Sequence, residues 1–191
     1  MVEEFYLVDT CSYLRLAPHL HPLLNKRIEN TNIILTIYPD IEDEYKYQSR
    51  LKNKFSWFND DIYKINRKPP LKLSRNQKIL IVDKYPFYEM ASSELNPPMP
   101  SPVDIKCLIC ADIIDSIKAV ITDDRNMYFL AQEFEINVIT SLEFLKILLD
   151  SKVLTFNKIK DIVNCWNDIN DLPIDFYKYY KLLYNENPPF K

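Results

Sequence analysis

The chain has 191 residues, of which 47% are hydrophobic and 27% are charged, and it contains no glycine. This length and composition are typical of one globular domain with a well-buried core, and they leave room for an added helical element. The lack of glycine excludes dinucleotide-binding loops, phosphate-cradling loops and glycine-flanked nucleophile elbows, because each of these needs backbone conformations or close approaches that glycine allows.

The sequence shows no pattern typical of a membrane protein or of a disulfide-rich protein. No apolar run approaches the roughly 18 residues of a membrane span, and the N-terminus lacks a basic region followed by an apolar stretch. The four cysteines lie within apolar or helical patterns, so we expect reduced thiols. Cys107 and Cys110 have the spacing of a zinc-binding pair, but no second pair of Cys or His accompanies them. A cytoplasmic protein with no membrane partner is the expectation.

The first part of the chain predicts two strands, at residues 5–8 and 33–38, because both segments are short and apolar. Between them, a set of leucines predicts helical structure that is interrupted at Pro18 and Pro22. A helix is expected over about residues 41–58. Its first turns carry acidic residues and its later turns carry basic ones, which complements the helix dipole.

The middle of the chain is less regular, and an apolar run at residues 79–82 fits either a strand or a helix. A proline-rich loop at residues 97–102 then precedes a helix that runs to about residue 116. The elements expected after it are a strand at residues 119–122, a helix at residues 127–135 and a strand at residues 137–140. This alternation predicts an α/β fold in which helices cover both faces of a parallel sheet.

The end of the chain, residues 150–191, predicts a helical extension that packs on a main domain formed by residues 1–149. Phe176, Tyr180 and Leu183 recur at helical spacing on its last helix. Such a stripe either belongs to the core or receives a partner, and the sequence leaves both interpretations open.

The net charge is −3, but the charged residues are unevenly distributed along the chain. A section at about residues 46–100 is basic and the remainder is acidic. Eleven Lys and Arg residues and only three acidic residues occur from Lys46 to Lys84, with aromatic residues among them. Basic groups attract phosphates and aromatic rings stack on unpaired bases, so this section predicts contact with nucleic acid. The alternative is a solvated basic helix with a buried aromatic side. The candidate contacts are Lys64, Arg67, Lys68 and Arg75.

Four acidic residues stand where predicted strands end or where the following helices begin. Asp9 ends the first strand, Glu44 lies one turn inside the next helix, Asp104 begins the helix after the proline loop, and Asp124 follows a later strand. Right-handed crossovers bring these positions to one edge of a parallel sheet. Each acid alone is typical of a helix cap or a solvated turn, whereas their joint placement predicts a cation site. Asp123 is the alternative to Asp124; Asp112 and Asp115 are expected to be solvated.

The order of these residues resembles the PIN-domain nuclease family. The matching motifs are Val8-Asp9-Thr10, Ile41-Glu-Asp-Glu44, Ser101-Pro-Val-Asp104 and Ile121-Thr122-Asp123-Asp124-Arg125. The resemblance covers residues 1 to about 149, is weakest at residues 59–100, and departs from the family by lacking glycine before the strand at residues 119–122. It implies a PIN-like three-layer fold with a central parallel sheet flanked by helices.

The same resemblance implies metal-dependent cleavage of RNA that leaves a 5′-phosphate. Asp9, Asp104 and Asp124 are the expected ligands of Mg²⁺ or Mn²⁺, which prefer oxygen donors. Glu44 is expected to bind a second ion or to support the residues that bind the first. Thr122 or Thr10 is expected to position a metal-bound water. Bacterial nucleases resembling this chain commonly occur in toxin–antitoxin pairs, so an antitoxin or a second copy at the C-terminal helices is an expected partner besides RNA.

Two other functions stay open at this point. One is a nucleic-acid-binding or scaffold protein on a PIN-like fold whose site is weak or inactive. The other is a different Mg²⁺-dependent enzyme that transfers phosphoryl groups or cleaves DNA. The presence of all four acids favours an active site over an inactive one, but the residues do not distinguish RNA from DNA.

Overall fold

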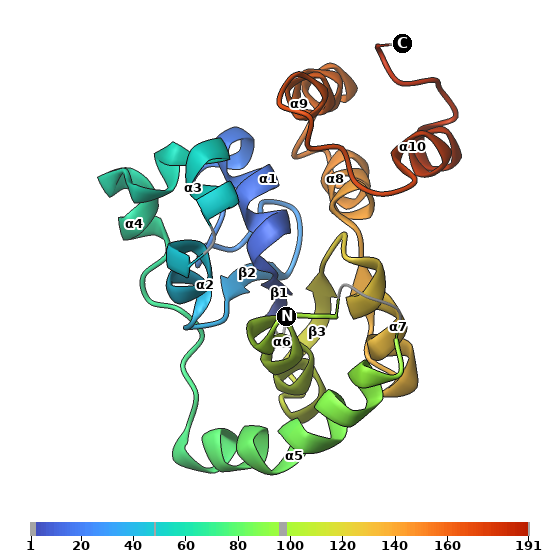
Figure 1. Ribbon diagram of the computed structural model, residues 1–191. Helices are drawn as coiled ribbons and strands as arrows, with labels where there is room; N and C mark the ends of the chain where they lie inside the picture. Colours follow the sequence, from blue (N-terminus) through green and yellow to red (C-terminus); the bar gives the residue numbers. More distant parts are fainter. Residues whose placement is uncertain (1–2, 48, 96–98, 191) are drawn as a thin grey trace.

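A four-stranded parallel sheet forms the centre of the protein, as a computed structural model shows (Figure 1). The structure describes residues 3–47, 49–95 and 99–190, apart from the side chain of Arg50. The strands are β1 (Glu4–Val8), β2 (Ile33–Ile37), β3 (Ile117–Ile121) and β4 (Val138–Ile139), in the order β2-β1-β3-β4. All three strand pairings are parallel. The predicted α/β class is therefore confirmed.

The central strand β1 determines which chain segments meet at the carboxyl edge of the sheet. Val8, its last residue, pairs with Ile37 on one side and with Ile121 on the other, so the three strands end level with one another. The backbone N–H of Asp9 then donates to the carbonyl of Ile121 at 3.1 Å. The residues that follow β1 and β3 are consequently neighbours, which is the arrangement that open parallel sheets use for their sites.

Helices cover both faces of the sheet, because successive side chains of each strand point to opposite sides. Leu7 and Val120 belong to one hydrophobic cluster, whereas their neighbours Val8 and Ile121 belong to the other. The Val8 side is covered by α1 (Thr10–Leu20), α2 (Ile41–Tyr47), α3 (Ser49–Lys54), α8 (Ser141–Asp150), α9 (Phe156–Asp168) and α10 (Phe176–Tyr184). The Leu7 side is covered by α5 (Arg75–Ser93), α6 (Pro102–Ile113) and α7 (Arg125–Glu133). The result is a three-layer α/β architecture (Figure 1).

The helix expected at residues 41–58 ends earlier than predicted. Helical structure stops at Lys54, and a 3-10 helix η1 (Ser56–Asn59) and the short α4 (Asp61–Asn66) follow. Phe55 and Phe58 are both buried, and the Phe58 ring stacks on Tyr45 with centroids 4.0 Å apart.

Two further sequence interpretations are resolved by the helices. The apolar run at residues 79–82 is helical and lies within α5, which Ser74 and Gln77 cap at its N-terminus. Pro18 does not interrupt α1, which continues through it to Leu20. Pro18 supplies no backbone N–H donor, and α1 ends two residues after it. The proline-rich loop lies partly outside the described residues.

The C-terminal extension shares the main hydrophobic core. Trp166 of α9 and both Phe176 and Tyr180 of α10 are fully buried in the cluster that contains Val8 and Tyr13. The expectation that this aromatic stripe could receive a partner is wrong for Phe176 and Tyr180, because the body of the protein already covers them. The large apolar side chains exposed on α5 are Ile79, Leu80, Val82, Phe87 and Met90.

Length and apolarity of the helices also bear on the membrane prediction. Within the described part of the chain, no helix has both the length and the apolar character needed to cross a membrane.

Candidate carboxylate site

Asp9 occupies the turn between β1 and α1 and is 3% exposed. One carboxylate oxygen accepts from the backbone N–H of Ser12 at 2.6 Å, which caps α1, and the other accepts from the hydroxyl of Thr122. Burial raises the pKa of Asp9 to about 6, and the nearby charge of Asp123 adds to that effect. Desolvation disfavours a lone carboxylate, so Asp9 is held as an anion only weakly at neutral pH.

Glu44 and Asp104 are brought toward Asp9 by α2 and α6. Glu44 accepts a hydrogen bond from the hydroxyl of Thr10, the first residue of α1. Asp104 accepts from the backbone N–H of Ser101 at 2.9 Å, and its own N–H donates to the Ser101 hydroxyl at 3.2 Å, which forms a capping box. The capping box fixes the first turn of α6 and directs Asp104 to the sheet edge.

The pKa of Asp104 responds to the neighbouring acids. It is raised well above its ordinary value, first by burial of the carboxylate and then by the charges of Glu44 and Asp9. The same three acids also raise the pKa of the buried Cys107 thiol. The structure therefore brings together Asp9, Glu44 and Asp104, which come from three separate elements, and their mutual effect is repulsive.

The two acids after β3 are held differently. Asp123 forms an ion pair with Arg15, in which both side chains are less than 10% exposed, and it accepts from the N–H of Ser141 at 2.9 Å. Asp124 caps α7 by accepting from the backbone N–H groups of Asn126 at 2.7 Å and Met127 at 3.1 Å. Within the described part of the chain, Asp123 therefore has a buried ion pair with a base, whereas Asp124 has none.

Thr122 connects the two groups of acids. Its hydroxyl donates to Asp9 and accepts from the backbone N–H of Asp124 at 3.0 Å. The residue is 2% exposed and lies at the tip of β3. Thr122 thereby orients the Asp9 carboxylate relative to the start of α7, which is a positioning role.

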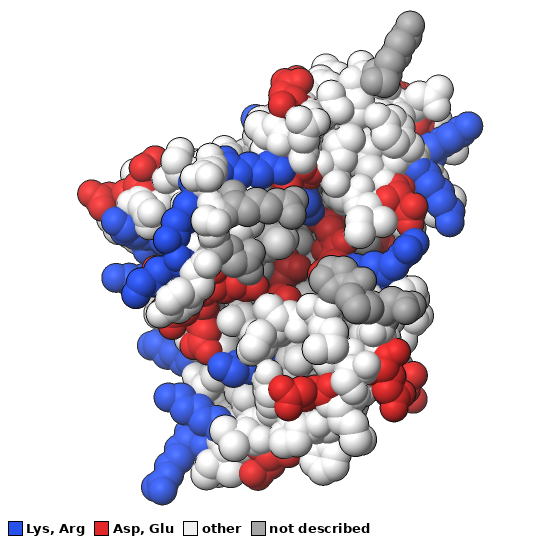
Figure 2. Space-filling view, viewed as in Figure 1, with Lys and Arg blue, Asp and Glu red and all other residues white. Residues whose placement is uncertain are grey.

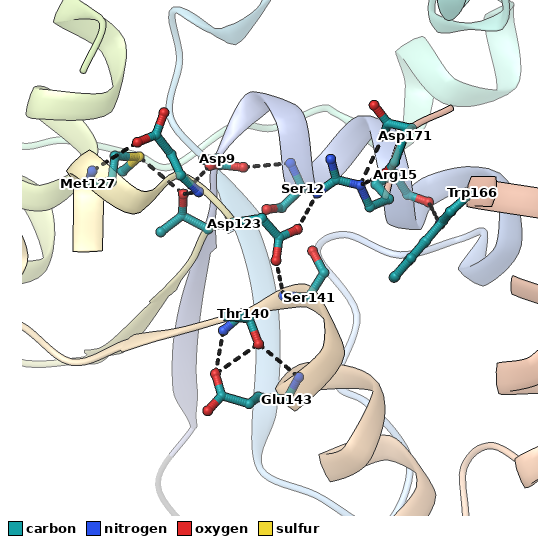
Figure 3. A network of polar contacts seen from close by, with 12 residues as sticks. Asp9, Ser12, Arg15, Asp123, Met127, Thr140, Ser141, Glu143, Trp166 and Asp171 are labelled. Carbon is teal, nitrogen blue, oxygen red and sulfur yellow. Dashed lines mark hydrogen bonds and ion pairs between the residues drawn. The ribbon is translucent and has the colours of Figure 1, made fainter. Parts of the chain in front are cut away.

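Arg15 is the part of this region that sequence reasoning missed (Figure 3). Besides Asp123, its Nε donates to the Asp171 carboxylate at 3.0 Å and to the Asp171 carbonyl at 2.9 Å. Its own carbonyl accepts from the indole N–H of Trp166 at 3.0 Å, and Lys54 binds the Asp171 carboxylate at 2.6 Å. The available signal was a lone arginine within the apolar run of α1, where a charge requires a partner.

The predicted nucleic-acid contacts do not behave alike. Arg67 is 2% exposed, stacks its guanidinium 3.6 Å from the centroid of the Phe58 ring, and donates to the Phe58 carbonyl at 2.9 Å. Its expected direct contact with nucleic acid is therefore wrong, since the side chain serves the core. Lys64 and Lys68 line an open cavity of about 550 Å³ with Lys46 and Lys52. Arg75 is exposed at the start of α5.

The surface around the acids has a distinct charge pattern. Figure 2 shows acidic side chains along the hollow in the middle of the displayed face, with Lys and Arg side chains around its margin. A polyanion could approach such a hollow only if basic groups at the margin, or a cation within it, offset the acids. Of the two acids expected to be solvated, Asp115 is exposed, but Asp112 accepts from Lys84 at 2.7 Å and from the Tyr88 hydroxyl at 2.8 Å.

The donor chemistry of Asp9, Glu44 and Asp104 fits a hard divalent ion such as Mg²⁺ or Mn²⁺, since all three offer carboxylate oxygens. Among the described residues, no three His, Cys, Asp or Glu side chains already converge as a finished metal centre. An ion would thus have to draw the carboxylates together. Zinc at Cys107 and Cys110 is disfavoured, because burial raises the pKa of both thiols, that of Cys110 to about 12.

Comparisons of this chain with models of known protein families, with curated proteins and with solved structures found no match.

Proposed function

We propose that this chain is a metal-dependent ribonuclease with a PIN-like fold, which hydrolyses phosphodiester bonds of RNA at the carboxylate site. The observation that supports it best is the placement of Asp9 and Asp104 near the carboxyl edge of the parallel sheet, where the charges of Glu44 and Asp9 add to burial in raising the pKa of Asp104. Acids that raise one another's pKa in a buried place destabilise a fold unless a cation joins them. A site that keeps this arrangement is best explained by a bound divalent ion.

In this proposal the residues of the site have different roles. Asp9, Asp104 and Asp124 would hold the ion, and Glu44 would hold a second ion or support the first from behind. A divalent ion at this position supplies polarisation of the phosphodiester and a lower pKa for a bound water. Thr122 keeps the Asp9 carboxylate oriented, and Ser101 does the same for Asp104. Such preorganisation avoids reorienting the acids during the reaction.

Basic side chains beside α2 offer a path for the RNA backbone. Lys46, Lys52, Lys64 and Lys68 line one cavity, and α2 also carries Glu44. RNA phosphates bound by these lysines would bring the strand close to the acids. The attraction of lysines for phosphates is independent of base sequence. Control by an antitoxin-like protein is part of the same proposal. Its contact surface would exclude the buried Phe176 and Tyr180.

A second candidate is a protein on the same fold that binds nucleic acid without cleaving it. It is favoured by one observation: within the described residues the acids are not yet assembled as a metal centre. Binding without metal-dependent cleavage would be its signature.

The deciding experiment follows cleavage of labelled single-stranded RNA, with single-stranded DNA in parallel, while Mn²⁺ or Mg²⁺ is added. We expect the parent to cleave RNA and both Asp9→Asn and Asp104→Asn to lose at least about a hundredfold in rate, as for loss of a group that stabilises charge in the transition state. Asp115→Asn is the matched control, since Asp115 is an exposed acid just after α6. Circular dichroism checks that each variant is folded.

Three outcomes count against the proposal. Cleavage by Asp9→Asn and Asp104→Asn at the parent rate would put the site elsewhere. RNA binding without cleavage under any divalent ion would favour the second candidate. Preferential cleavage of DNA would mean that the substrate is DNA and not RNA, with the same catalytic site.

The lysine cavity has its own test. Replacing Lys64 and Lys68 together by Ala should reduce the slope of log affinity against log salt by about 1.4, because each contact to single-stranded phosphate contributes about 0.7. Lys160→Ala serves as control, since Lys160 lies on α9 and pairs with Glu186. An unchanged slope in the double variant would mean that RNA does not follow this cavity.

A further inference from the structure

A second cavity, of about 370 Å³, adjoins the carboxylate site. Its walls come from the tip of β3, from α7, from the start of α8 and from the segment that leads into α10. Thr122, Asp123 and Asp124 belong to its lining, so it shares a wall with the acids. The volume is near the lower end of the range of small-ligand sites, which suits one planar group and not a protein helix.

Exposed aromatic side chains line this cavity without being needed by the core. Tyr128 and Phe129 on α7 are 46% and 43% exposed, and their rings lie 6.0 Å apart at an interplanar angle of 71°. The neighbouring residues Met127 and Leu130 are fully buried and attach the helix to the sheet. Tyr179 of α10 adds a third ring from the opposite wall. Aromatic faces so arranged can stack on a base of any identity.

Basic groups accompany the rings. Arg125 of α7 and Lys178 of α10 both line the cavity. Arg125 also bridges the two walls through an ion pair with Asp175 at 3.1 Å, in which the side chains are 60% and 47% exposed. An exposed ion pair contributes little to stability. A phosphate could therefore replace Asp175 as the partner of Arg125 with little loss of folding stability. The cavity therefore offers rings for a base and cations for its flanking phosphates.

We propose that this cavity binds an unpaired nucleobase of the substrate RNA, adjacent to the phosphodiester bond that the acids address. The inference rests on the proposed ribonuclease function. Continuity with Asp124 and Thr122 places the base next to the reacting phosphate, and the aromatic walls require that base to be free of a duplex. The C-terminal extension, through Ile174, Lys178 and Tyr179, thus completes the substrate site in addition to covering the core.

The test measures binding of a fluorescently labelled single-stranded RNA of twelve nucleotides in EDTA, where metal-dependent cleavage does not interfere. Tyr128→Ala combined with Phe129→Ala should weaken binding about 5- to 150-fold, which corresponds to about 1–3 kcal/mol for one stacked base. Tyr128→Phe keeps the ring and should bind like the parent. Tyr177→Ala is the control, because Tyr177 is 52% exposed on α10 but does not line the cavity.

A second readout locates the contacted base, and the part of it that uses the parent alone does not depend on how well the variants fold. A set of the same RNA with one abasic nucleotide at successive positions should show one position where the parent loses affinity and the double variant does not. The salt slope should stay unchanged in the double variant, since no phosphate contact is removed. A duplex RNA of the same length should bind the parent more weakly than the single strand.

The experiments distinguish failure of the nucleobase proposal from failure of the ribonuclease proposal. If the parent cleaves RNA but the double variant binds it equally well, or if no abasic position matters, the nucleobase cavity is overturned and the ribonuclease stands. If the parent shows the abasic position and the loss in the double variant but never cleaves, the cavity stands and catalysis is overturned. A parent that does not bind the single strand in EDTA, or binds duplex equally well, also overturns the cavity.

Discussion

The acids on the two sides of the sheet edge are held in opposite ways. Burial and then the charges of nearby acids raise the pKa values of Asp9 and Asp104, Asp123 acting on Asp9 and both Glu44 and Asp9 acting on Asp104. Asp123, directly after Thr122, is bound instead by Arg15, and Asp124 is bound by the first amides of α7. All of these acids lie near the same edge of the sheet, and a buried arginine neutralises Asp123.

This difference separates structural acids from candidate ligands more clearly than their positions do. A carboxylate that a buried arginine neutralises can hold two elements together, as Asp123 holds α1 against β3. Carboxylates that repel one another do the reverse and stabilise the protein only after a cation arrives. The four predictions below test that contrast, beginning with the largest expected effect.

Removing Arg15 should be the most damaging change on the neutralised side. Arg15→Ala leaves Asp123, which is 5% exposed, without its counter-charge and also removes the bonds to Asp171. Loss of one partner of a buried ion pair costs about 3–5 kcal/mol. Urea unfolding measures it. Lys146→Ala, which breaks the exposed pair with Asp150, should cost at most about 0.5 kcal/mol; an equal loss in both variants would contradict the structural role of Arg15.

The pH dependence of stability should differ between the parent and Asp9→Asn in EDTA. Because the folded pKa of Asp9, about 6, is above its unfolded value of 3.8, the folded protein binds the proton more tightly. Stability is then full below about pH 4, falls as pH rises toward about 6 and stays low above it, a change of about 3 kcal/mol. Asp9→Asn should show a smaller fall, because only the raised pKa of Asp104 then remains. The free energies of unfolding at pH 4.5 and 7.5 give the answer, and parallel changes in both proteins would refute it.

Divalent ions should stabilise the repelling group. At about 100 times its dissociation constant, Mn²⁺ should raise the free energy of unfolding of the parent by about 2.7 kcal/mol. Asp104→Asn removes one donor and should reduce this gain, whereas Asp115→Asn should keep it. Thermal melting at a series of Mn²⁺ concentrations makes the comparison. Equal shifts in parent and Asp104→Asn would place the ion away from the three acids.

Asp124 provides the smallest effect on stability, because its structural role is that of a helix cap. Asp124→Ala should cost about 1 kcal/mol, while Asp124→Asn should stay close to the parent, since Asn is an equally good N-cap. Under the proposed function both variants lose cleavage activity. Chemical unfolding together with RNA cleavage separates the two roles, and an active Asp124→Asn variant would show that Asp124 serves only as a cap.

The sequence alone determined the parts of the protein that depend on local patterns. Short β-branched and apolar segments predicted all four strands, and the acids that follow them predicted which residues reach the carboxyl edge of the sheet. These predictions hold because strand patterns are read over a few neighbouring residues and because parallel crossovers bring strand ends to one edge. The convergence of Asp9, Glu44 and Asp104 follows from the same two rules.

Only the tertiary structure decided which charges and rings meet across the chain. Arg15 binds Asp123, 108 residues away, and Asp171, 156 residues away, so no local pattern could indicate either pair. Arg67, which belongs to a basic section, is buried because Phe58 and the turn after α3 enclose it. Phe176 and Tyr180 likewise became core residues because α10 packs on α8. Each outcome depends on desolvation and packing among distant segments, which spacing along the chain does not encode.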